Sequence, residues 1–511
     1  MSAFHQLLRL AVGWVLVATY LRWRRRRRTG GLPYPPGPKP DPIIGNLRHV
    51  PKKSAWLTYA SWGKQYGDVV SFEAFGTRVI VLNTLKAISD LLEKRGAVYS
   101  ERHHNVMQDL MNMRTTNMVT MDYTDEFRLH RKVVNTALNQ TASYAYFPIQ
   151  EREAYALTER LLDTSANWHK EVTRFANSTI LTVTYGHRVV TDDDYLVKLS
   201  DEAIQHLRQL VQPTAFLVNF LPFLKYLPDW APGAGFKAFA RLARQHSENL
   251  CEIPFKALRS QMDAGTAETS YCTRLIDAKG SITGRENEEG IIKTTAGIMY
   301  AAGSATTESV IASFILNMVL HPEVQKKVQA ELDSVIGNSR LPTFADQDSL
   351  TYLKYCMQET LRWNPVSALG GVPHAAQHDD VYEGMFIPKG SVIIANQWTV
   401  MHDETMYPDP FKFWPERWDG RFPQARDARA LSFGFNRRIC PGRHLALNSL
   451  YITAATMMAA FNLSKEIGAD GQEIEPLIDY SSGPPKPFKC RFTPRSDGAV
   501  ALVKASVSAT L

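Results

Sequence analysis

The most informative stretch of the chain is Phe433-Gly434-Phe435-Asn436-Arg437-Arg438-Ile439-Cys440-Pro441-Gly442. A cysteine that binds a metal must be a thiolate, and a nearby guanidinium such as Arg438 lowers the cost of holding that charge. Pro441 and Gly442 predict a tight turn that leaves backbone N–H groups free to point at the sulfur. A lone cysteine in a loop is more often an ordinary buried thiol. The interpretation of Cys440 as a ligand therefore depends on all ten residues together.

This segment resembles the haem-binding loop of the cytochrome P450 family, whose pattern is Phe-x-x-Gly-x-Arg-x-Cys-x-Gly. Phe433, Arg438, Cys440 and Gly442 match that pattern, and Asn436 stands where the family has glycine. That glycine permits an unusual backbone angle, and Asn is the residue with a side chain that tolerates it best. The resemblance implies that Cys440 is the axial thiolate ligand of the iron of haem b. It also implies that Phe433 and Arg438 belong to the cofactor site.

A second informative segment is a long helix expected from about Glu288 to Leu320, which contains no proline and ends before Pro322. At about 1.5 Å per residue it would run roughly 45–50 Å, enough to cross a whole domain. Its last 25 residues carry a single charge, Glu308, so a second membrane span is an alternative. The residues in its middle are small and polar. They favour a core helix whose backbone something large and flat approaches closely.

The middle of this helix resembles the oxygen-activating stretch of the same family, with matches at Ala302, Gly303, Thr306 and Thr307. Taken alone, Thr306 would be a hydroxyl that bonds back to a carbonyl one turn earlier. The resemblance implies that Thr306 donates a hydrogen bond to bound oxygen. The family's acidic residue is replaced by Ala305. The catalytic proton relay is therefore expected to use Thr306, Ser304, Glu308 or water.

A third pattern is Glu359-Thr360-Leu361-Arg362, in which two side chains three residues apart on a helix would meet. Alone, this is a common surface pair. The expected helix over residues 350–363 is largely apolar, however, so the pair could be buried and would then need a further partner. Pro415-Glu416-Arg417-Trp418 supplies one. The resemblance implies a structural cluster of Glu359, Arg362 and Arg417 beside the haem.

Haem propionates are negatively charged and need cationic partners. Residues 127–131 resemble the family's Trp-x-x-x-Arg helix, with Phe127 in place of Trp and Arg131 retained. His374 stands where the family has an Arg or His that contacts a propionate. We therefore expect Arg131 and His374 in the cofactor site.

The expected fold class is mainly α, the cytochrome P450 fold, with a long central helix and a minor β portion at both flanks. A small hairpin is predicted over residues 69–82, and β-rich segments over residues 381–395. With 511 residues, 44% of them hydrophobic, the chain can bury a large core. The five cysteines include no CxxC pair and are too scattered for a disulfide framework, which argues against the usual zinc sites.

The N-terminus predicts a membrane anchor with a basic stop over residues 1–28. Residues 7–21 are apolar apart from Arg9 and Thr19, and a block of arginines follows. A cleaved signal peptide, the alternative, would carry its positive charge before the apolar run. The order found here favours an uncleaved anchor in the endoplasmic reticulum, with the catalytic domain cytosolic.

Residues 29–45 are rich in proline and predict a stiff, extended spacer, followed by a haem-thiolate catalytic domain over residues 46–511. The first thirty residues contain seven arginines and no acid, and these account for the whole net charge of +7. A folded surface that is neutral overall argues against a nucleic-acid partner.

The resemblance covers nearly the whole chain and implies a monooxygenase that receives electrons from NADPH through a separate reductase. The reductase would dock near Arg437, Arg443 and Lys132. The run Tyr99-Ser100-Glu101-Arg102 and residues 485–490 look most like fungal members that tailor secondary metabolites. The substrate pocket should be lined by residues 106–118, 216–223, 299–306, 366–372 and 481–484.

These stretches are mostly apolar, which fits a lipophilic substrate such as a terpenoid, polyketide or indole. Two alternatives remain open. A haem-thiolate isomerase or peroxide-driven enzyme is favoured by Ala305 and disfavoured by the retained Thr306. A membrane-tethered helical binding protein without catalysis would lack the haem-thiolate spectrum.

Overall fold

One long helix, α14 (Glu288–Leu320), lies at the centre of the computed structural model and has the bounds predicted for it. The structure describes residues 5, 27–42, 44–74, 76–191, 193–210, 215–278, 282–284, 287–478, 480 and 483–510. Within those residues, α14 is the helix that is long and apolar enough to cross a membrane, but 72% of that window is buried inside the protein. The prediction of a core helix is therefore confirmed. The predicted anchor segment, residues 7–21, lies outside the described residues.

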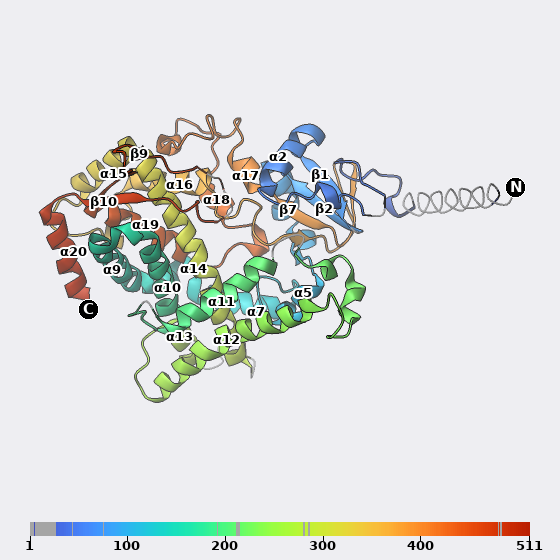
Figure 1. Ribbon diagram of the computed structural model, residues 1–511, viewed down its shortest axis with the longest axis horizontal. Coiled ribbons are helices and arrows are strands. Elements are labelled where there is room, and N and C mark those ends of the chain that lie inside the picture. The colour runs from blue at the N-terminus through green and yellow to red at the C-terminus, as the bar shows by residue number, and fades with distance from the viewer. Residues whose placement is uncertain are drawn as a thin grey trace.

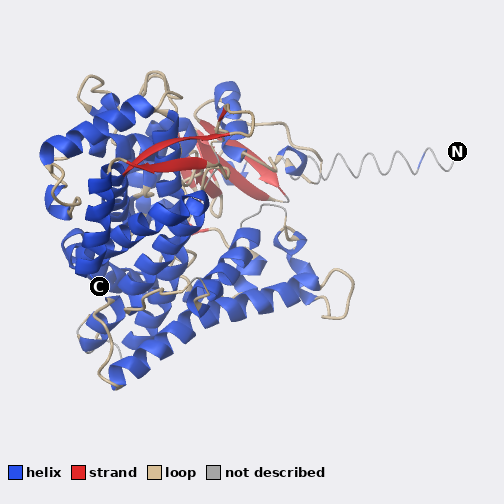
Figure 2. Cartoon of the chain, turned by 60° about the vertical axis from the view of Figure 1, so that its left-hand side comes forward, coloured by secondary structure: helices blue, strands red, loops and turns tan. Residues whose placement is uncertain are grey.

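The other helices pack around α14 and make the chain mainly helical, as Figure 2 shows. The principal ones are α2 (Ala55–Tyr66), α5 (Val106–Leu110), α6 (Met113–Thr116), α7 (Asp125–Leu138), α9 (Phe147–Thr164), α10 (Trp168–Tyr185), α11 (Tyr195–Leu210), α12 (Gly235–Asp263), α13 (Tyr271–Asp277), α15 (Pro322–Val335), α16 (Thr351–Trp363), α19 (Arg443–Ala460) and α20 (Asp497–Thr510). Shorter turns include η2 (Ser89–Lys94), α4 (Gly96–Tyr99), η5 (Leu217–Asn219), α17 (Gln397–Met401), η8 (Pro415–Trp418) and α18 (Ala428–Ser432).

Small residues in α14 let neighbouring helices approach it closely. A Cβ added at Gly303 would lie 2.8 Å from Cδ1 of Ile180 in α10, and one at Gly297 would lie 2.3 Å from Sγ of Cys251 in α12. These two glycines are thus explained by helix packing.

The strands form two groups at opposite ends of the helical body, one beside α2 and the other beside α15 and α19 (Figure 1). In the described part of the chain, the larger sheet has the order β1-β2-β7-β4-β3, formed by β1 (Val69–Ala74), β2 (Thr77–Leu82), β7 (Val392–Ala395), β4 (His374–Ala375) and β3 (Glu101–Arg102). Two smaller sheets comprise β5 (Asp380–Tyr382) with β6 (Met385–Ile387), and β8 (Phe461–Ile467) with β9 (Glu473–Ile474) and β10 (Cys490–Pro494).

The pairing of β1 with β2 confirms the predicted hairpin, with Val69 opposite Leu82. The segments predicted over residues 381–395 form most of β5 and all of β6 and β7. The pairing of β3 with β4 places Arg102 opposite His374, two residues that are 272 positions apart in the chain. This register brings together side chains that the sequence did not link.

The proline-rich segment is extended, as predicted, but it lies against the folded domain. The Ser71 amide N–H donates to the carbonyl of Pro36 over 2.7 Å, and the Phe386 N–H donates to that of Pro33 over 2.7 Å. A Cβ added at Gly37 would lie 1.9 Å from the Ser71 carbonyl oxygen, so only glycine fits there. Because its carbonyls accept hydrogen bonds from residues of β1 and β6, this part of the predicted spacer packs as part of the domain itself.

A buried ionic cluster joins α16 to the turn η8. The Glu359 carboxylate accepts hydrogen bonds from Nε and Nη2 of Arg362 over 2.9 and 2.8 Å. Nε of Arg417 reaches the same carboxylate at 3.4 Å, and all three side chains have no exposed area. The structure thus brings together the three residues that the sequence suggested as a cluster.

Neighbouring groups satisfy the remaining polar atoms of the cluster. The indole N–H of Trp418 and the amide N–H of Trp414 donate to Glu359 over 3.2 and 3.1 Å. Nη1 of Arg362 donates to the carbonyl of Met401, at the end of α17, over 2.8 Å. Full satisfaction is what allows such charges to be buried at all. The cluster therefore joins three separate segments of the chain, α16, α17 and η8.

Replacing Glu359 with Gln should destabilise the fold strongly, by about 3–5 kcal/mol, because two buried guanidiniums would lose their counter-charge. The measurement is the apparent melting temperature from circular dichroism, together with the yield of folded protein. The matched control is Asp419→Asn, which breaks the exposed pair of Asp419 with Arg421 and should change little. Equal effects from the two substitutions would contradict the prediction.

Candidate active site

The cysteine loop runs from the end of α18 to the start of α19 and is closed by its own backbone. The Cys440 N–H donates to the carbonyl of Phe433 over 2.7 Å. Two residues of the loop have positive φ, Gly434 at +79° and Asn436 at +43°. The prediction that Asn436 adopts the left-handed conformation is confirmed, and the loop keeps its shape without the usual glycine.

Cys440 is a half-buried residue, in contrast to the fully buried Cys272 and Cys356. Burial raises the pKa of the Cys440 thiol, while a hydrogen bond from the Gly442 N–H and the charges of Arg131 and Arg443 lower it in part. Nη1 of Arg443 also donates to the Cys440 carbonyl over 3.3 Å. A thiolate here would meet donors and cations, but a bound metal would have to supply the rest of its stabilisation.

One turn of the core helix α14 is uncovered. Ala302 and Thr306 are exposed, although Ser304 and Thr307 beside them are buried. The Thr306 hydroxyl donates to the Ala302 carbonyl over 2.8 Å, as expected for a threonine within a helix. An exposed turn at the centre of an otherwise buried helix is a candidate surface for binding a ligand.

The other two candidates for the proton relay lie on a different side of the helix. The Ser304 hydroxyl donates to Oδ1 of Asn177 in α10 over 2.8 Å, and both residues are buried. Glu308 lies 3.5 Å from Nδ1 of His169, also in α10. The structure therefore does not bring Ser304 or Glu308 to the uncovered turn with Thr306. At 3.6 residues per turn, positions 302 and 306 share one face of the helix and position 304 lies on another.

Buried cations gather next to the loop. Nε of Arg438 donates to the Ser100 carbonyl over 2.8 Å, and its guanidinium lies 3.9 Å from the centre of the Phe127 ring. Nε of Arg102 donates to the Val119 carbonyl over 2.9 Å. In the described ranges neither arginine forms a salt bridge with a carboxylate. Burial lowers the pKa of Arg102 to about 9 and that of Arg438 to about 10.

His374 lies in the same cluster, where β3 and β4 pair. Burial, followed by the charge of Arg102, lowers its pKa to about 3. Nδ1 of His374 is 2.7 Å from the Tyr99 carbonyl, which can only accept, so Nδ1 carries the proton. A neutral ring therefore leaves Nε2 as an acceptor. An anion could bind Nε2 only by bringing a proton there, which its charge would favour.

Arg102 is the functional candidate that sequence reasoning missed. Tyr99-Ser100-Glu101-Arg102 was noted only as a sign of the fungal subgroup, and no local pattern pairs Arg102 with His374. Among the described residues the two buried arginines have no carboxylate partner, His374 is a neutral ring beside them, and the turn of α14 that carries Thr306 is exposed. Haem offers an iron that accepts a thiolate and propionates that accept cations, so these residues fit it.

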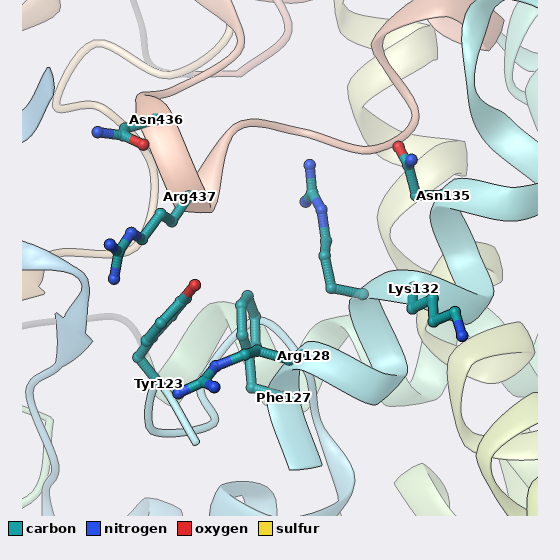
Figure 3. A pocket seen from close by; sticks show the side chains of 8 residues that line it. Tyr123, Phe127, Arg128, Lys132, Asn135, Asn436 and Arg437 are labelled. Carbon is teal, nitrogen blue, oxygen red and sulfur yellow. The ribbon is translucent and has the colours of Figure 1, made fainter. Parts of the chain in front are cut away.

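A solvent-open hollow of about 350 Å³ lies beside the loop (Figure 3). It is lined by Tyr123, Phe127, Arg128, Arg131, Lys132 and Asn135 from α7 and the segment before it, and by Asn436 and Arg437 from the loop. Arg437 and Tyr123 point toward one another, with the guanidinium 4.9 Å from the ring centre. Four of the eight lining residues are basic, so the hollow is a positive surface next to Cys440. Arg443 does not line it.

Comparison with known proteins agrees with this geometry. The family model described as Cytochrome P450 matches residues 35–492. Similar proteins include Cytochrome P450 monooxygenase 208 of Postia placenta, 38% identical over 99% of both chains. Others are Cytochrome P450 monooxygenase ple1 of Rhodocybe pseudopiperita, 38% identical over 92% of this chain and 91% of the relative, and Cytochrome P450 monooxygenase claR of Ampulloclitocybe clavipes, 36% identical over 92% and 88%. The chain belongs to the cytochrome P450 family and is a monooxygenase of that family.

Proposed function

We propose that Cys440 ligates the iron of haem b and that the enzyme oxidises a lipophilic small molecule, using electrons that a separate reductase takes from NADPH. The observation that carries this proposal is the closed loop around Cys440, whose thiol accepts a hydrogen bond from the Gly442 N–H and lies near the guanidiniums of Arg131 and Arg443. When bound, the haem would supply the activation of molecular oxygen and the insertion of one oxygen atom into the substrate.

The residues that would hold the cofactor come from four separate parts of the chain. Cys440 would bind the metal, with Phe433 in the same loop packed at the edge of the largest hydrophobic cluster. The propionates would be bound by the guanidiniums of Arg102, Arg131 and Arg438, and by His374 once a proton is brought to its Nε2. Each of these cations is raised in free energy by burial or by its neighbours, so an anion would be bound favourably.

Thr306 is the residue proposed to handle the proton. Its hydroxyl is on the uncovered turn and bonds to the Ala302 carbonyl, and rotation about χ1 would let Oγ1 donate toward the open side instead. With Ala305 in the acid position and Ser304 turned toward α10, the proton would reach Oγ1 from water. Thr306 would thus be the only protein hydroxyl of the original relay candidates to take part.

The substrate is proposed to be a terpenoid, polyketide or indole, because the walls on either side of α5 and α6 are apolar. Met107, Met111 and Met113 pack with Val218 of η5 and with Ala240 and Ala243 of α12. Flexible methionines let such a wall adapt to a bulky lipophilic molecule. The resemblance to fungal tailoring enzymes supports a place in secondary metabolism.

Membrane attachment in the endoplasmic reticulum is proposed from two features. One is the predicted anchor and basic stop over residues 1–28. The other is a set of exposed apolar side chains between η5 and α12: Leu217, Phe223, Tyr226 and Trp230, which are 63%, 64%, 77% and 84% exposed. Aromatic residues of this kind prefer the interface between lipid and water.

The basic hollow beside the loop is proposed as the docking surface for the reductase. An acidic partner would be attracted to Arg128, Lys132 and Arg437, which lie next to the loop that holds Cys440. Arg443 was included in the original expectation, but its bond to the Cys440 carbonyl gives it a role inside the loop. All three relatives are named monooxygenases, which favours this electron supply over peroxide-driven chemistry.

Reversing charge at the hollow should slow electron transfer. The double variant Lys132→Glu with Arg437→Glu is expected to reduce the rate of haem reduction by an NADPH-driven reductase roughly tenfold at low salt, with a smaller loss as salt is raised. The control reverses two exposed charges elsewhere, Arg491 on β10 and Lys504 on α20. Stopped-flow absorbance gives the rates. Equal rates in the two double variants would rule out the hollow as the docking site.

Replacing Cys440 with Ser should abolish the red-shifted absorption band of the reduced, carbon-monoxide-treated protein, because an alcohol does not replace the thiolate. The control is Cys251→Ser, which alters a thiol in α12 and should leave the band in place. Persistence of the band in the Cys440 variant would refute the proposed ligand. Product analysis with candidate terpenoids, polyketides and indoles, in a host that has a reductase, would then identify the substrate.

A further inference from the structure

Asn436 contacts Glu93 in two ways from its left-handed position, and the side-chain contact is one that a glycine could not make. Its backbone N–H donates to Oε1 of Glu93 over 3.2 Å, and its side-chain amide donates to the Glu93 carbonyl. Glu93 lies in the last turn of η2, and its carbonyl also accepts from the backbone N–H of Arg95 at the end of that helix. The side chain of Asn436 therefore supplies a second donor to this carbonyl and joins the loop to the end of η2.

Gly96, the first residue of α4, leaves the space that this side chain occupies. A Cβ added at Gly96 would lie 2.3 Å from Nδ2 and 2.9 Å from Cγ of Asn436. The φ angle of Gly96 is not among the positive ones, so its backbone does not require glycine. The absence of a side chain at Gly96 is thus explained by the presence of one at Asn436.

The segment that Asn436 contacts also carries the carbonyls of the cation cluster. Tyr99 ends α4, and its carbonyl is bonded to His374, while the carbonyl of the next residue, Ser100, accepts from Arg438. On the other side of Asn436, Phe435 is buried in one cluster with Leu91 and Tyr99. The residue therefore lies between the sulfur loop and the segment that orients the cations.

We propose that Asn436 is a positioning residue that fastens the Cys440 loop to residues 93–96, with Gly96 as its matched partner. This inference rests on the proposed role of Cys440 as the haem ligand. The amide of Asn436 fixes the loop relative to the cation cluster, so that sulfur and cations are held at one spacing for a single rigid cofactor. Loss of the amide leaves the sulfur loop free to shift and weakens the bond between sulfur and metal.

A double-mutant cycle tests the pairing, using the full-length, haem-loaded protein. Gly96→Ala alone should lower the melting temperature and enlarge several-fold the fraction of reduced carbon-monoxide complex that lacks the red-shifted band, because the new methyl group displaces Asn436. In an Asn436→Gly background the same change should be neutral or stabilising, since the space is open and Ala favours a helix over Gly. A sign reversal supports the pairing. An equal effect of Gly96→Ala in both backgrounds overturns it.

Asn436→Asp tests the amide itself, because the substitution keeps the shape and the tolerance for positive φ but turns the donor into an acceptor facing Glu93. We expect it to shift the midpoint potential of the haem and to enlarge the band-less fraction as much as Asn436→Gly does. If both variants only lower the melting temperature, with band and potential unchanged, Asn436 has a general structural role and the inference fails. The Cys440→Ser protein separates the two hypotheses: if it retains the band, the proposed ligand is wrong, whatever Asn436 does.

Discussion

The proposed site depends on the sulfur of Cys440, which as a ligand would have to carry a negative charge in a place that disfavours it. Desolvation raises the pKa of the Cys440 thiol, and the Gly442 N–H and the guanidiniums of Arg131 and Arg443 only partly offset that effect. Such a site is stable as a thiolate when a metal shares the charge. The hydrogen bond that closes the loop on the Phe433 carbonyl and the packing of α19, which follows the loop, on α14 would hold that sulfur in place.

The cation cluster presents the same constraint with the opposite sign. Arg102, Arg438 and His374 are buried together, the two arginines lower the pKa of His374, and the described residues give the two arginines no carboxylate within ion-pair distance. The Cys440 thiolate and the buried arginines are each unfavourable alone, and both would become favourable when a single ligand carries a metal and anionic groups. The preference for a metal complex with attached carboxylates is therefore contained in the protein's own electrostatics.

Sequence reasoning succeeded where the information is local and failed where it depends on register or on the face of a helix. The span of α14 follows from the absence of proline, and the left-handed angle at Asn436 follows from one residue type. The meeting of Glu359 and Arg362 follows from helical spacing. Arg102 was missed because its partnership with His374 exists only through the pairing of β3 with β4. Ser304 was expected in the same proton relay as Thr306 because the two are only two positions apart in the sequence. The helix, however, turns the Ser304 side chain toward Asn177. The proline-rich segment was expected to be a separate spacer because composition does not reveal that its carbonyls accept hydrogen bonds from Ser71 and Phe386 of the folded domain.

Two of the departures from the family pattern, Asn436 and Ala305, are accommodated in different ways. Asn436 is matched by specific neighbours, an acceptor at Glu93 and an empty space at Gly96, so its effect is absorbed within the loop. Ala305 has no such match: its carbonyl accepts the Ser309 hydroxyl over 2.6 Å, and no acid on the described chain has been brought to the turn in its place. A missing proton donor can be replaced by water, which needs no complementary side chain, whereas an added side chain at a crowded backbone needs one. For this reason the substitution at Ala305 in α14 needs no compensating residue, whereas the substitution at Asn436 in the Cys440 loop needs the space left by Gly96.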